Sequence, residues 1–158
     1  MKNIVVSVAG GQASFVTAKY AIYLARLLQA KLTAIYVVDE KTLQDLLKTR
    51  IFVEAEAREY ETNLEQQGRY FMERVRVMAE AKKIEFEGLV LKGVIHDEVI
   101  NKTRELQADL LVMGDLKEVL SWQEASYSEG ERIFRESPRS VVVVKSPQEV
   151  ERLYKEVT

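Results

Sequence analysis

The apolar run at residues 110–113 (LLVM), closed by Gly114, is the feature that most constrains how this chain folds. Four consecutive apolar residues without polar alternation are typical of a strand that helices cover on both faces, as in a parallel sheet. A second run of this kind, residues 141–144 (VVVV), follows after a loop and a helix. Ligands of open α/β sheets bind beyond the carboxyl ends of the strands, so residues 115–128 are where we expect a small-molecule site.

The rest of the chain alternates between strand and helix patterns, which predicts strands joined by single-helix crossovers. Five strands are predicted, at residues 4–8, 31–38, 84–93, 110–113 and 141–144. Helices are predicted at residues 14–29, 54–82 and 95–106 and from Ser128 onward, and residues 40–53 are predicted to form a short helix or an ordered lid. Gly68 lies inside the longest of these helices, where it either interrupts the helix or costs roughly 1 kcal/mol relative to alanine.

The predicted fold class is therefore α/β, with a single open five-stranded parallel sheet, helices on both of its faces and right-handed connections. Residues 1–146 are expected to form this α/β domain. Residues 147–158 carry apolar side chains at helical spacing and are expected to form an amphipathic C-terminal tail helix.

The composition excludes several classes of site and partner. With 158 residues, 47% of them hydrophobic and 30% charged, the chain is long enough for one globular domain with its own core. It has no cysteine, which excludes disulfides and thiolate metal sites, and His96 is its only histidine. A net charge of -2 with both signs interspersed provides no basic stripe for nucleic acid. No apolar stretch is long enough to cross a membrane, so we expect a cytoplasmic protein that binds no membrane.

Several motifs lie in a fixed order along the chain: the strand at residues 4–8 followed by Gly10, AKLTAIYVVD from Ala30, ADLLVMG from Ala108, and SEGERIFRESPRSVVVVK from Ser128. In sequence and spacing they resemble the universal stress protein family over nearly the whole chain. The resemblance implies a Rossmann-like sheet with the strand order 3-2-1-4-5. It also implies a homodimer that pairs through the fifth strand, as in many members of that family.

The fifth strand supports a dimer on physical grounds as well. With the implied order it is an edge strand, and residues 141–144 form an apolar edge that contains neither proline nor an interior charge. Unpaired edges of this kind promote aggregation, whereas pairing with a second copy closes a two-fold assembly. The expected interface residues are Val141, Val142, Val143 and Val144. The alternative is that the C-terminal tail covers this edge within one protomer.

The resemblance also bears on ATP, which one branch of the family binds. In that branch the loop after the fourth strand reads glycine, two residues, glycine, nine residues, glycine, then serine or threonine. Here the corresponding residues are Gly114, Lys117, Tyr127 and Ser128, and Ala9 stands where the family places a nucleotide-contacting aspartate. Glycines in such loops let backbone N–H groups approach phosphates. The sequence therefore resembles the branch that does not bind ATP, and no cofactor is expected.

A nucleotide site with a modified phosphate loop is the alternative, with ATP or AMP as the ligand. In it, Lys117 and Ser128 would meet phosphate, while backbone groups of Val37 and Val38 would hold the base. The positions that match the family's nucleotide site are Ala9, Gly10, Val37, Val38, Gly114, Lys117, Tyr127 and Ser128.

Some of these residues, and others, also have purely structural interpretations. Ser128 and Glu131 form the Ser-x-x-Glu pattern of a capping box, which predicts that the Ser128 hydroxyl caps the helix that follows the fourth strand. His96 next to Asp97 is expected to make local hydrogen bonds. Asp109, at the opposite end of its strand from the expected site, is interpreted as structural.

Three functions remain open from the sequence. The first is a dimeric stress-response or regulatory protein that contacts an unidentified protein partner through residues 40–53, residues 117–127 and the tail. The second is a nucleotide-binding switch. The third is a nucleotide-hydrolysing enzyme, because residues 9–14 (AGGQAS) partly resemble the Ser-Gly-Gly-x-Asp-Ser loop of the ATP pyrophosphatases. Ala9 and Ala13 replace the serine and the aspartate of that loop, and no catalytic residue is assigned.

Overall fold

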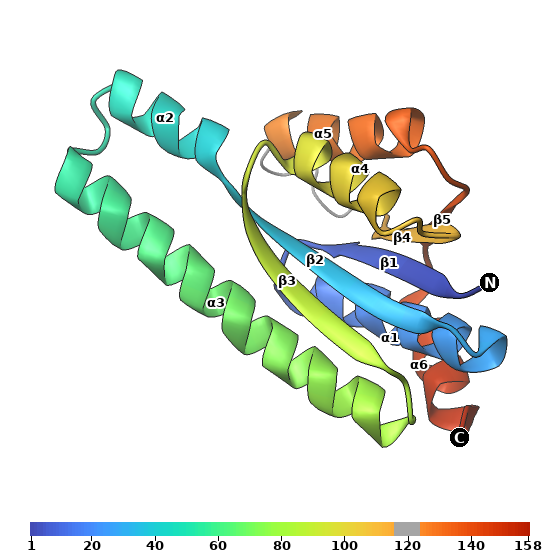
Figure 1. Cartoon of the computed structure of the whole chain (residues 1–158). Helices are drawn as coiled ribbons and strands as arrows, with labels where there is room; N and C mark the ends of the chain where they lie inside the picture. The colour runs from blue at the N-terminus through green and yellow to red at the C-terminus, as the bar shows by residue number, and fades with distance from the viewer. Residues whose placement is uncertain (116–123) are drawn as a thin grey trace.

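Five parallel strands form one sheet in the order β3-β2-β1-β4-β5, as the sequence analysis predicted. The structure is a computed structural model (Figure 1), and it describes residues 1–115 and 124–158, without the side-chain surroundings of residues 124–128. The strands are β1 Asn3–Val8, β2 Lys31–Asp39, β3 Phe86–Gly93, β4 Leu110–Gly114 and β5 Val141–Val144.

Helices cover both faces of the sheet (Figure 1). They are α1 Gln12–Leu28, α2 Glu40–Lys48, α3 Glu54–Ala81, α4 Ile95–Glu105, α5 Glu124–Glu136 and α6 Pro147–Glu156. One hydrophobic cluster joins the sheet to α1, α3 and α6, and a second cluster joins its other face to α4 and α5. Among the described residues, no helix is both long enough and apolar enough to cross a lipid bilayer.

The predicted starts of α5 and β3 were wrong. Helix α5 begins at Glu124, so Ser128 lies inside the helix and not at its start, where the capping box was predicted. The Glu131 carboxylate instead pairs with the Arg135 guanidinium at 2.7 Å. Strand β3 begins at Phe86 because the N–H of Ile84 still donates to the Ala79 carbonyl at the end of α3.

Residues 40–53 divide into a short helix and a loop. Asp39 ends β2 and caps α2, since its carboxylate accepts hydrogen bonds from the N–H groups of Lys41 and Thr42. Helix α2 ends at Lys48, and α3 begins at Glu54. Figure 1 shows that α2 and the first turns of α3 extend away from the sheet.

Gly68 does not interrupt α3, which runs for 28 residues, and its role lies in packing. A Cβ atom at position 68 would lie 2.7 Å from Cδ1 and 2.8 Å from Cε1 of Tyr36. On its opposite edge the same ring faces Gly10, where an added Cβ would lie 3.3 Å from Cε2. Two glycines, one on α3 and one after β1, therefore make room for a single tyrosine ring.

The tail helix α6 packs on α1. Val150 is buried in the core that α1 shares with the sheet, and the Nζ of Lys19 lies 2.6 Å from Oε1 of Glu151. Lys19 and Lys82 both place their ammonium groups over the ring of Tyr154. These contacts put α6 on one face of the sheet, so among the described residues they do not support the alternative in which the tail covers the edge of β5.

Asp109 ties the beginnings of two strands together. Its Oδ2 accepts hydrogen bonds from the backbone N–H groups of Lys2 at 2.7 Å and Asn3 at 3.0 Å. The N–H of Asn3, followed by that of Lys2, lowers the pKa of this carboxyl group. Because Asp109 lies at the amino ends of the strands, its contacts agree with the structural role that the sequence predicted.

The Gly68→Ala substitution should destabilise the protein by about 1–3 kcal/mol, because the added methyl group meets the Tyr36 ring. In an unobstructed helix interior the same change would stabilise by about 0.5–1 kcal/mol. Urea unfolding of the variant measures the difference. In a Tyr36→Ala background the effect should change sign, and destabilisation of equal size in both backgrounds would show that the Tyr36 contact is not the cause.

Candidate functional site

A cleft of about 400 Å³ lies where the carboxyl ends of β1, β2 and β4 meet α1, α3, α4 and α5. Its volume falls within the range of roughly 300–1,000 Å³ that is usual for small-molecule sites. Five of the eight predicted site residues line it: Ala9, Gly10, Val37, Val38 and Gly114. Lys117 lies outside the described residues. Tyr127 and Ser128 lie on the backbone of α5, and their side chains are likewise outside the description.

The turn from β1 into α1 forms one wall of the cleft. Gly10 and Gly11 have φ values of 86° and 88°, a conformation that L-residues rarely adopt, and they turn the chain directly into the helix. The N–H of Ala9 donates to Oγ of Ser14 at 3.0 Å, which closes the turn. Ala9 lines the cleft at the position where, by the resemblance described above, an aspartate would stand. No carboxylate therefore comes from this position.

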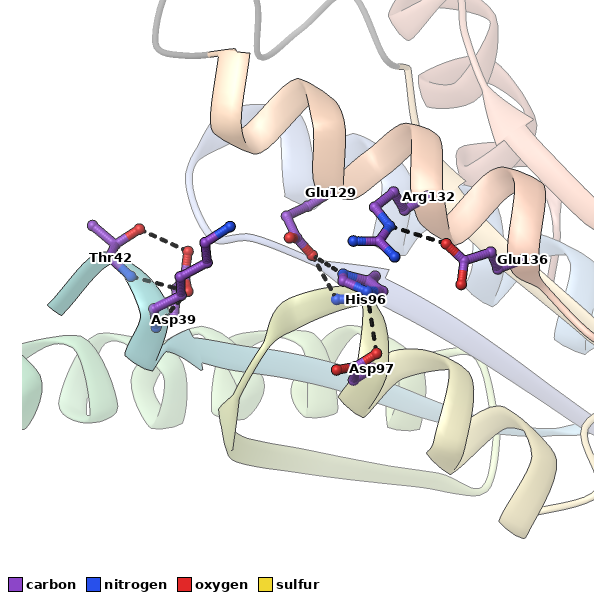
Figure 2. Close-up of polar contacts among 8 residues, drawn as sticks. Asp39, Thr42, His96, Asp97, Glu129, Arg132 and Glu136 are labelled. Carbon is purple, nitrogen blue, oxygen red and sulfur yellow. Dashed lines mark hydrogen bonds and ion pairs between the residues drawn. The ribbon is translucent and has the colours of Figure 1, made fainter. Parts of the chain in front are cut away.

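The end of β2 supplies the next wall. Val38 is buried in the core between the sheet, α1 and α3, whereas Val37 packs with the cluster beneath α4 and α5. Asp39 follows them, and its Oδ2 accepts a hydrogen bond of 2.8 Å from Oγ1 of Thr42 (Figure 2). Both carboxylate oxygens of Asp39 are thus used to begin α2, and both Asp39 and Thr42 line the cleft.

Ile95 and Glu129 line the opposite wall. Behind it lies His96, whose side chain is between α4 and α5 (Figure 2). One carboxylate oxygen of Glu129, Oε2, lies 2.7 Å from the backbone N of His96 and 2.7 Å from its ring Nδ1. On the other side of the ring, Nε2 lies 3.1 Å from Oδ1 of Asp97. His96 as a whole residue is only 4% exposed. We therefore interpret its imidazole as a structural link between the two helices.

Glu129 is the site residue that sequence reasoning missed. It lies 33 positions after His96, and nothing near it in the sequence marks it as a capping group. Its carboxylate accepts a hydrogen bond from the N–H of His96 in the first turn of α4, where the helix dipole favours a negative charge. The prediction of local hydrogen bonds for His96 and Asp97 agrees with this geometry, but the stronger partner comes from a different helix.

The charged side chains among the described lining residues of the cleft are all acidic. Three carboxylates line it, from Asp39, Asp115 and Glu129, and no lysine or arginine is among its described lining residues. Asp115 lies 4.0 Å from the ammonium of Lys145, which is itself largely exposed. The described lining side chains therefore offer an anionic ligand no positive charge. Within residues 1–115 and 124–158, no cluster of three or more His, Asp or Glu side chains is placed to hold a metal ion.

The α3 side of the cleft is lined by Tyr36, Tyr60 and Leu64, which the sequence analysis did not place there. Tyr36 precedes Val37 on β2 and therefore points to the opposite face of the sheet, towards α3. Burial, and to a smaller extent the neighbouring Tyr60, raise the pKa of the Tyr36 phenol. The alternating pattern of β2 was visible in the sequence, but the long-range position of α3 was not.

Comparison with known proteins decides the family. The model of the universal stress protein family matches residues 1–145. The chain belongs to this family. A universal stress protein of Methanocaldococcus jannaschii is 29% identical over 147 residues, which cover 93% of this chain and 84% of that protein.

Solved structures of the family share the fold. A universal stress protein in complex with cAMP superimposes with a TM-score of 0.67 at 20% identity, covering 91% of this chain and 97% of that one. The universal stress protein of Archaeoglobus fulgidus in complex with dAMP gives a TM-score of 0.62 at 14% identity, covering 92% and 98%. These likenesses concern the arrangement of the sheet and its helices.

The Glu129→Ala substitution should lower the free energy of unfolding by about 2–3 kcal/mol, because it leaves the His96 imidazole and the start of α4 without their shared acceptor. Chemical denaturation followed by circular dichroism measures this loss. Glu131→Ala is the matched control on the same helix. It removes an exposed ion pair with Arg135, so its effect should stay below about 0.5 kcal/mol. Equal effects of the two substitutions would contradict the link between α4 and α5.

Proposed function

We propose that this protein is a regulatory member of the universal stress protein family that works as a homodimer in the cytoplasm and does not take ATP into its cleft. The observation that carries the proposal is the charge of the cleft: its described lining residues include three with carboxylates and none with a basic side chain. A triphosphate needs backbone N–H groups or cations to neutralise its charge.

The residues after β4 support the same conclusion. By resemblance, two of the three glycines of the ATP-binding branch are replaced by Lys117 and Tyr127, and the strand-one aspartate by Ala9. A side chain occupies space that a phosphate-binding loop leaves empty, and it disfavours positive φ angles. Lys117 would supply only one positive charge, whereas the neighbouring wall is lined by the acidic residues Asp115 and Glu129.

The sheet order supports the dimer. It makes β5 an edge strand, and the N–H of Leu111 on β4 donates to the carbonyl of Ser140 just before β5. Because backbone groups alternate in direction along a strand, the N–H and C=O of Val141 and Val143 then point to the free edge. A second β5 strand would pair these groups about a two-fold axis.

A protein partner is proposed to bind away from the cleft. Ile51 and Val53 join α2 to α3, and each is 63% exposed. Figure 1 places this junction at the far tip of the arm formed by α2 and α3. Regulation would then depend on protein contacts made by a dimer that presents two such arms.

A nucleotide-binding switch is the second candidate, and specific observations favour it. Two structural neighbours hold cAMP and dAMP, nucleotides with a single phosphate. The cleft is lined by Val37 and Val38, the positions that by resemblance match the base-binding side of the family site. A monophosphate brings less negative charge to the acidic wall than ATP does, so AMP is the ligand that this candidate favours.

Thermal denaturation with ATP, ADP and AMP separates the candidates. We expect no stabilisation by ATP, whereas a ligand at a hundred times its Kd would add about 2.7 kcal/mol. The triple variant Ala9→Asp, Lys117→Gly, Tyr127→Gly should gain ATP binding, because it restores the family's glycines and aspartate. Ala9→Asp alone is the control and should not bind ATP.

Each result of that experiment has a defined meaning. Stabilisation of the native chain by ATP at micromolar concentration would contradict the proposed function. Stabilisation by AMP alone would select the nucleotide switch. A triple variant that folds but gains no affinity for ATP would show that the matched positions are not the phosphate site.

Sedimentation equilibrium tests the dimer. The native chain should sediment as a dimer, and Val143→Pro should sediment as a monomer, because proline removes an outward N–H while an edge strand tolerates it. Val143→Ala is the matched control, since it removes side-chain bulk but keeps the N–H, and it should remain dimeric. A dimeric Val143→Pro variant would rule out pairing through β5.

A further inference from the structure

The cleft extends over both faces of the sheet, and its two sides differ in chemistry. On the α4 and α5 side lie Val37 and the acidic wall. On the other side is the part of the cleft that we name the α3 lobe, lined by Ser14, Thr17, Tyr36, Tyr60 and Leu64. Side chains from α1, β2 and α3 form this lobe, and none of the positions that match the family's nucleotide site contributes a side chain to this set.

Two of the polar groups in the α3 lobe already have partners. Oγ of Ser14 accepts from the N–H of Ala9, and Oγ1 of Thr17 donates to the carbonyl of Ala13 at 3.2 Å. The hydroxyl of Tyr36 has no hydrogen-bond partner among the described residues, although Tyr36 is only 6% exposed. Buried hydroxyl groups nearly always have a partner, and leaving one without it is costly.

The position of the Tyr36 ring is fixed by its surroundings. Gly68 on α3 and Gly10 after β1 contact its two edges so closely that neither position has room for a methyl group without a shift. The ring therefore has little freedom to turn its hydroxyl towards another protein group. A tyrosine phenol is protonated at neutral pH, and burial raises the pKa of this one further, so the hydroxyl can act as a donor in the cleft that Tyr36 lines.

We propose that the α3 lobe is a binding site for an uncharged, planar ring compound, and that the Tyr36 hydroxyl recognises it by donating a hydrogen bond to an oxygen or nitrogen acceptor on that compound. The apolar walls come from the Tyr60 ring and Leu64. The five residues of the α3 lobe carry no positively charged side chain, so an uncharged compound fits this part of the cleft better than an anion does. This inference concerns a different side of the cleft from the proposed exclusion of ATP.

NMR titration of the full-length chain with three probes of similar size tests the proposal. The probes are benzamide, which is uncharged and carries an acceptor, ethylbenzene, which has none, and benzoate, which is charged. Backbone amide signals of Ser14, Tyr60 and Leu64 report binding in the lobe. Benzamide should bind about tenfold more tightly than either other probe, as one additional hydrogen bond implies.

The Tyr36→Phe variant removes only the hydroxyl and should weaken benzamide binding about tenfold while leaving ethylbenzene binding unchanged. Its melting temperature should equal or exceed that of the native chain, because a buried hydroxyl without a protein partner has been removed. Tyr23→Phe, which removes the same atom from a tyrosine of α1 that does not line the cleft, is the matched control and should change neither affinity.

Three results would overturn the assignment: no shift in the lobe signals with any probe, equal affinity for benzamide and ethylbenzene, or undiminished benzamide affinity in Tyr36→Phe. The test is independent of the ATP experiment. ATP binding by the native chain would contradict the proposed function and leave the benzamide result intact, whereas loss of the benzamide result would leave the exclusion of ATP intact.

Discussion

The pairing of β1 between β2 and β4 is the constraint on which the rest of the structure depends. Val5 and Val6 of β1 are fully buried and lie in register with residues of both neighbours. The chain leaves β1 in one direction to form β2 and β3 and returns on the other side to form β4 and β5. The crossovers therefore diverge at the end of β1, and open α/β sheets have their binding crevice at such a switch point.

The same divergence gives the cleft two unlike sides. Successive residues of a strand point to opposite faces of the sheet, so Tyr36 enters the core beneath α3 while Val37 enters the core beneath α4 and α5. Each side then takes its chemistry from the helices above it. Helix α5 brings Glu129, which links His96 to the acidic wall, and α3 brings Tyr60 and an aromatic recess. A family fold thus carries a site whose ligand preferences depend on a few helix residues.

The sequence could predict those parts of the site that depend on short stretches of chain, and it could not predict those that depend on contacts between distant elements. The carboxyl ends of the strands were predicted to within one residue because buried apolar runs and the glycines after them are local patterns, and five of the predicted residues do line one cleft. The start of α5 was wrong because Glu124 and Ala125 extend the helix upstream of Ser128, and a capping pattern marks a start only where no helix precedes it. Glu129 could not be found because its partner lies on another helix.

The sequence by itself determined the α/β class and the positions of the five buried strands, and through its motifs it indicated the family, because hydrophobic periodicity and turn residues act over short stretches of chain. Only the tertiary structure decided which side chains share the cleft. Gly68 shows the difference: in the sequence it is a weak point in a helix, whereas in the fold it provides the space that the Tyr36 ring occupies. That role depends on how closely β2 and α3 approach each other, and such long-range distances are set by packing of the whole core.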